Sequence, residues 1–151
     1  MNILKIQQDV LKALLKDERV GHCKLRDGRV LITTCGAVAH IIPEADLHLR
    51  LDSRPEATSL KGLVDPATTY YAENELTPTD NYIRAGKVRE YIRNFDDVIT
   101  YIDVANLKNF DKDAKLYQKG NNRAPVMVSE RLPLEKEPSI VGVVMPMNIN
   151  K

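Results

Sequence analysis

The sequence predicts an α+β fold in which short helices cover one face of antiparallel sheet, without a parallel βαβ crossover. Three observations support this: an Asp27-Gly28 pair typical of tight hairpin turns, short distances between strand-like segments, and two apolar runs at 124–129 and 139–147. A charged, proline-containing stretch separates these two runs. We therefore expect one compact domain over residues 1–151, whose sheet is anchored by a C-terminal hairpin. The most buried positions should include Val126, Val128, Ile140, Val141, Val143 and Val144.

Apolar residues at helical spacing predict an amphipathic helix over residues 3–17. The apolar half of its helical wheel is formed by Ile3, Leu4, Ile6, Val10, Leu11, Leu14 and Leu15. Lys5, Lys12 and Lys16 cluster on the opposite side, bordered by Asp9, while Gln7 interrupts the apolar half. Such a row of lysines is either a solvated helix face or a surface for an anionic partner.

A hairpin should follow the helix, turning at Asp27-Gly28 with a two-residue loop. That register places Cys23 opposite Ile32 and Cys35 opposite Val20, so the two cysteines should remain reduced thiols. Alternation predicts one packed face and one solvated face. The packed face would carry Cys23, Leu25, Val30 and Ile32.

Two further short strands are predicted at 37–42 and 47–51, and an irregular connector follows over 52–80. Prolines punctuate this connector, and one helical turn is expected at 59–64. Tyr70 and Tyr71 lie within it. They would either anchor a partner protein or pin the connector onto the sheet.

The second half of the chain predicts another helix, at 84–95, because Val88, Tyr91, Ile92 and Phe95 fall at helical spacing. A strand at 98–102 and a short helix at 104–110, capped by Asp103, should follow. Lys108 and Lys112 would point outward, and 114–118 reads as a strand. Each half thus runs from a short helix into antiparallel strands that end at a proline-marked apolar strand, which suggests two modules at about 1–52 and 96–151 with a connector at 53–95.

At this point the chain resembles the processivity clamps, the DNA sliding clamps of the polymerase III β-subunit and PCNA type. The segments that carry the resemblance are 98–107 and 116–147, and within the latter 124–128 and 143–147 look like the closing strands of a clamp domain. The Asp27-Gly28 hairpin and residues 37–43 fit more loosely.

The resemblance implies two helix-plus-sheet modules, with helices lining a channel and contacting DNA phosphates without reading bases. The residues implied in DNA contact are Lys5, Lys12, Lys16, Lys108 and Lys112. A clamp ring contains six such domains, so encirclement would require a homo-oligomer. Replication proteins would be further partners, and the small size suggests a phage or mobile-element origin.

The composition limits which other functions the chain could have. Lys and Arg total 22 against 21 Asp and Glu, a net charge of +1, so DNA contact must come from charge gathered on one face. No run suits a membrane span or a signal peptide, and we expect a cytoplasmic protein. His22, His40 and His48 lack ligand spacing and should be hydrogen-bonded or exposed, so we expect no metal and no cofactor.

No catalytic motif is present, and the chain is expected not to be an enzyme. The alternatives to a DNA-contacting clamp are a clamp-fold interaction or regulatory module that does not bind DNA, and an enzyme with an unrecognised site.

Overall fold

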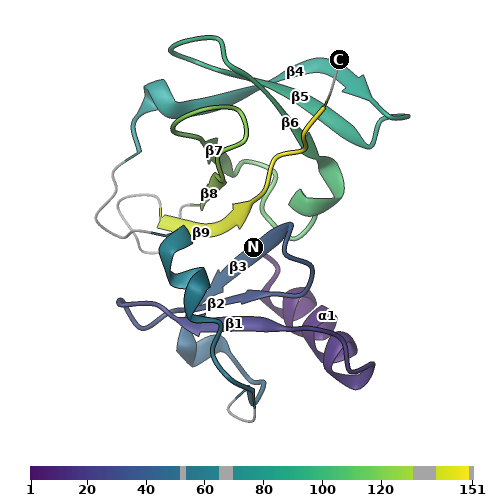
Figure 1. Ribbon diagram of the computed structural model, residues 1–151, viewed down its shortest axis with the longest axis vertical. Coiled ribbons are helices and arrows are strands. Elements are labelled where there is room, and N and C mark those ends of the chain that lie inside the picture. The colour runs from purple at the N-terminus through teal and green to yellow at the C-terminus, as the bar shows by residue number, and fades with distance from the viewer. Residues whose placement is uncertain (52–53, 65–69, 131–138, 150–151) are drawn as a thin grey trace.

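The computed structural model describes residues 1–51, 54–64, 70–130 and 139–149, and within them an α+β fold built on one nine-stranded sheet. The strand order is β1-β2-β3-β9-β8-β7-β4-β5-β6, and the pairings between the described strands are antiparallel (Figure 1). The strands are β1 Gly21–Lys24, β2 Val30–Thr33, β3 Val38–Ile42, β4 Glu75–Ile83, β5 Val88–Arg93, β6 Ile99–Asp103, β7 Lys115–Tyr117, β8 Val126–Glu130 and β9 Ser139–Val144. The helices are α1 Ile3–Leu15 and the short 3₁₀ helices η1 Glu44–Asp46, η2 Thr58–Leu63, η3 Ala72–Asn74 and η4 Val104–Leu107.

Two three-stranded meanders meet in the middle of this sheet. The first, β1-β2-β3, follows α1, and the second, β7-β8-β9, follows η4. Their last strands pair, with Val38 opposite Val144 and His40 opposite Gly142. Strands β4 to β6 extend the sheet beyond β7 and lie at the end of the molecule away from α1 (Figure 1).

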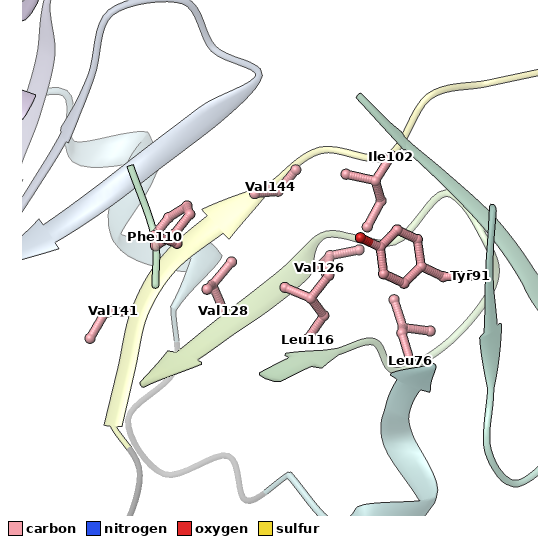
Figure 2. Close-up of a cluster of buried hydrophobic side chains, with 9 residues drawn as sticks. All are labelled: Leu76, Tyr91, Ile102, Phe110, Leu116, Val126, Val128, Val141 and Val144. Carbon is pink, nitrogen blue, oxygen red and sulfur yellow. The ribbon is translucent and has the colours of Figure 1, made fainter. Parts of the chain in front are cut away.

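The predicted C-terminal hairpin is confirmed as β8 and β9, two central strands. Five of the six predicted core valines and isoleucines are buried, and Ile140 is half-buried. Figure 2 shows the main cluster on one face of the sheet, to which β4 to β9 and the loop after η4 contribute side chains. Its members are Leu76, Tyr91, Ile102, Phe110, Leu116, Val126, Val128, Val141 and Val144.

The first hairpin forms where predicted, but its register is shifted by one residue. Gly28 takes a positive φ of 88°, and its N–H donates to the Leu25 carbonyl oxygen. The Leu25 N–H donates in turn to the Arg29 carbonyl oxygen, so the loop has three residues rather than two. Cys23 therefore faces Leu31 instead of Ile32. A slip of one residue exchanges the faces of a strand.

As a result, both faces of this hairpin are covered, and the predicted solvated face is wrong. Val30 and Ile32 pack under α1, whereas Cys23 and Leu31 pack with Val64 and the side chains of η2 on the opposite face. The two cysteines are free thiols as expected; Cys23 is buried and Cys35 is exposed. Burial raises the pKa of the Cys23 thiol.

The predicted helix at 84–95 is wrong, because this segment is the turn of a hairpin followed by β5. Arg84, Ala85 and Gly86 all have positive φ, which ends β4 and reverses the chain. The apolar positions of β5 suit a strand as well as a helix, since a short run of β-branched and aromatic residues is ambiguous. Strand β4 was missed because it contains Pro78, which is tolerated where β7 no longer pairs with β4.

The predicted strand at 47–51 is also wrong. This segment follows η1 without a partner strand, yet it keeps its alternation, because Leu47, Leu49 and Leu51 pack against the cluster beneath α1. The predictions for the other short elements of the chain are confirmed. The helical turn at 59–64 is confirmed as η2, the strands at 98–102 and 114–118 as β6 and β7, and the helix capped by Asp103 as the shorter η4.

Gly142 is a position where the fold excludes a side chain. A Cβ placed there would overlap the ring of Phe110 and lie 2.9 Å from the Ala39 carbonyl oxygen. Phe110 also stacks on His40, with ring centroids 4.8 Å apart. The Phe110 ring thus lies over the paired strands β3 and β9 at Gly142, the position opposite His40.

We expect Gly142→Ala to destabilise the protein by about 1–3 kcal/mol, the usual cost of an overpacked core. Because Phe110 is the main obstacle, combining this change with Phe110→Leu should cost less than the sum of the two single changes. Urea unfolding of the four proteins measures the coupling. Strict additivity would contradict the contact between Phe110 and residue 142.

Candidate nucleic-acid interface

The helix α1 is held to the sheet by a narrow apolar stripe. Ile6, Val10 and Ala13 are buried, and the first two pack with Val30, Ile32 and Ile42 of the sheet. Gln7, expected to interrupt the apolar half, is itself buried. Its amide donates to the Asp46 carbonyl at 2.9 Å and accepts from His48 N–H at 2.8 Å, which ties α1 to the segment after β3.

The lysines of α1 lie on its outer side, as predicted. Lys12 and Lys16 are exposed, whereas Lys5 is partly covered and its Nζ lies 3.1 Å from Asp9 Oδ1. The side chain of Asn2 caps the helix by accepting from Lys5 N–H. The cationic row predicted from the sequence therefore exists, but one of its three charges is paired with a carboxylate.

Three leucines expected in the packed half of α1 are exposed instead. Leu4 and Leu15 expose 70% and 78% of their surface, and Leu11 exposes 44%. The apolar residues of this helix span a wider arc than the sheet covers, so those at its margin remain in water. They lie beside the lysines and give α1 an outer surface that is both apolar and basic.

Lys108, the residue directly after η4, lines the same groove as Asp9 of α1. The next residue, Asn109, is buried, and its Nδ2 lies 3.4 Å from Asp9 Oδ2. Partial burial raises the pKa of Asp9, but hydrogen bonds from Lys5 and Asn109 and the positive charges of Lys5 and Lys108 outweigh it, so this pKa lies below its ordinary value. Lys5 and Lys108, far apart in sequence, thus act on one ionised carboxylate.

Lys112 is exposed and follows Asp111, whose Oδ1 lies 2.7 Å from the Met1 amino nitrogen. That amino group is also 2.7 Å from the buried carboxylate of Glu130. The loop carrying Lys112 therefore lies beside the start of α1. Lys112 makes no side-chain hydrogen bond or ion pair within the described residues.

The two candidate partner-binding tyrosines differ in environment. Tyr70 is half-buried, its ring lies 5.9 Å from that of Tyr117, and Lys119 lies over it at 5.0 Å. This residue pins the connector onto the sheet. Tyr71 is 59% exposed and is available to a partner.

A groove of about 180 Å³ separates α1 from η4, a feature that sequence reasoning missed. Its lining includes Asp9, Cys35, His40, Lys108 and Asn109. His40 is buried, and its Nε2 has no hydrogen-bond partner among the described residues, so the expectation of a hydrogen-bonded or exposed histidine is wrong here. It holds for His22, which bonds to the Arg54 carbonyl oxygen, and for the exposed His48.

Comparisons of the chain with family models, curated proteins and solved structures find no match. In the described part of the chain there is no group of three or more side chains arranged to hold a metal ion. Nor is any helix there long and apolar enough to cross a membrane.

The buried ring of His40 should make stability depend on pH. Desolvation lowers the pKa of His40 from 6.5 to about 4, with smaller effects from Asp9, Lys108 and the Met1 amino group. Between these two pH values His40 is protonated in the unfolded chain but mostly neutral in the folded protein. Stability from this group is therefore complete above about pH 6.5 and falls by roughly 3 kcal/mol as the pH is lowered to about 4.

Replacing His40 by Phe should flatten the pH dependence of the unfolding free energy between pH 4 and 6.5. The matched control is His48→Phe, which changes an exposed imidazole and should keep the wild-type slope. Denaturant unfolding at several pH values measures both. Equal slopes for His40→Phe and wild type would show that His40 titrates normally.

Proposed function

We propose that this protein is a non-enzymatic, sliding-clamp-like factor in DNA replication or repair, which contacts duplex DNA without sequence preference through helix lysines. The observation that carries the proposal is the gathering of Lys5 and Lys108 around Asp9, next to the exposed Lys12 and Lys16. Two elements far apart in the sequence, α1 and η4 with the residue that follows it, thereby contribute cations to one surface.

The order of elements supports the clamp-like interpretation. Each of the two meanders follows a helix, and the meanders pair through their last strands, β3 and β9. Phe110 and Asn109, which follow η4, contact His40 and Asp9 on the face of the sheet that α1 covers. A channel-lining surface requires helices from both modules on one face of the sheet, and these contacts support that arrangement.

The electrostatics favour weak binding by a single copy. Asp9 offsets one of the lysine charges, and the whole chain carries only +1. Phosphate contacts are sequence-independent and add up over many cations, so strong binding would need several copies around one duplex. We therefore propose a homo-oligomeric ring as the DNA-binding form.

A second function, a clamp-fold interaction module that does not bind DNA, is favoured by the apolar margin of α1. The exposed Leu4, Leu11 and Leu15, together with Tyr71, are side chains of the kind that protein partners cover. The outer strands are poorer docking sites, because Ala57 N–H bonds to the His22 carbonyl on β1 and Met147 N–H bonds to the Tyr101 carbonyl on β6.

The DNA proposal predicts that replacing Lys5, Lys12 and Lys16 together by Glu weakens binding to duplexes of every sequence. The fold should survive, since the buried stripe of α1 is unchanged. The slope of log affinity against log salt should flatten by about 0.9 for each phosphate contact removed. Fluorescence anisotropy with two unrelated duplexes at several salt concentrations measures both effects.

The matched control replaces three exposed cations elsewhere, Lys87, Lys115 and Arg123, by Glu. It changes the net charge by the same amount and should bind DNA more tightly than the α1 variant. Two results would refute the proposal: a wild-type protein with no duplex affinity at low salt, or equal losses in the two variants.

A further inference from the structure

A cleft of about 470 Å³ opens on the face of the sheet opposite α1, where the β1–β2 loop meets η2. Its size falls within the range of small-molecule sites in proteins, roughly 300–1,000 Å³. The lining residues are Leu25, Arg26, Asp27, Arg29, Lys61, Gly62 and Val64. Three cations and one carboxylate thus surround an apolar floor.

Arg29 is the fixed cation of this cleft. Its Nε lies 2.8 Å from Asp27 Oδ2, and one terminal nitrogen donates to the Ile140 carbonyl at 2.6 Å. The other Asp27 oxygen accepts from Arg29 N–H at 3.0 Å. The carboxylate is therefore satisfied by Arg29, and the second terminal nitrogen of the guanidinium remains for another acceptor.

The other two cations are less constrained. Lys61 lies 3.8 Å from Glu56 Oε2, a loose and half-exposed pair. Arg26 is exposed, and within the described residues it makes no hydrogen bond or ion pair. Both side chains can therefore turn toward an anion without breaking a strong contact.

The floor of the cleft is continuous with the core. Val64 is buried and packs with Cys23 and Leu31, and Leu25 packs against the same cluster. Gly62 leaves the wall open, because a Cβ there would meet no atom within 4 Å. A ligand can thus place an apolar group on Leu25 and Val64 while its charged end meets the cations.

We propose that this cleft binds a small organic phosphate monoester, with its apolar group on Leu25 and Val64 and its phosphate held by Arg26, Arg29 and Lys61. A phosphate carries more charge and more acceptor oxygens than a carboxylate and matches three donors better. This site is independent of the proposed DNA surface, which lies on the other face of the sheet.

Isothermal titration calorimetry with phenyl phosphate tests the proposal. Phenyl phosphate should bind at least tenfold more tightly than inorganic phosphate, phenol or phenylacetate, because only it supplies both the apolar group and the dianion. Arg26→Ala and Lys61→Ala should each weaken binding about tenfold, the usual effect of losing one charge-assisted hydrogen bond. Gly62→Leu should abolish binding by filling the open wall.

Two controls should bind phenyl phosphate as wild type does: Lys87→Ala, an exposed cation elsewhere, and the triple Glu variant of Lys5, Lys12 and Lys16. Circular dichroism melting checks that each variant is folded. The proposal fails if folded Arg26→Ala and Lys61→Ala retain wild-type affinity, if phenylacetate binds as tightly as phenyl phosphate, or if the wild type binds no phenyl phosphate.

Discussion

The pairing of β3 with β9, with the Phe110 ring lying across Gly142, is the contact on which the rest of the fold depends. It joins the two meanders, and strands β4 to β6 extend the sheet beyond the second one. Only glycine leaves room for the ring. The ring in turn packs on His40, whose burial lowers the pKa of its imidazole to about 4. The same contact brings Asn109, which follows η4, to Asp9 on α1, so the approach of Lys108 to this helix is a consequence of the packing.

Much of the sheet could be predicted because its central strands are locally unambiguous. The valine-rich runs of β8 and β9 have no polar face of the kind that a surface helix needs. Asp103, which caps the start of η4, marks the end of β6. The errors arose where local pattern allows two structures. Val88, Tyr91 and Ile92 fit a helix or a strand, and pairing with β4 and β6 decides between them. Asp27-Gly28 suits two-residue and three-residue loops alike, and one residue of difference exchanges the faces of the hairpin.

The candidate surfaces were predictable only in part. The spacing of Lys5, Lys12 and Lys16 follows from helical geometry alone, so their outward position could be expected. Which leucines of α1 would be covered depends on the width of the sheet beneath, and the approach of Lys108 depends on tertiary packing. The cleft on the opposite face is assembled from the β1–β2 loop and η2 and is fixed by the distant carbonyl of Ile140, which no local pattern contains.

A light-scattering measurement of mass in solution, with and without duplex DNA, tests the clamp-like account most directly. One chain has a mass of 17.1 kDa, and a ring of six clamp domains would therefore have about 100 kDa. The account predicts a ring-sized assembly that persists or becomes more populated on DNA. A mass of one chain at every concentration, unchanged by duplex DNA, would contradict it.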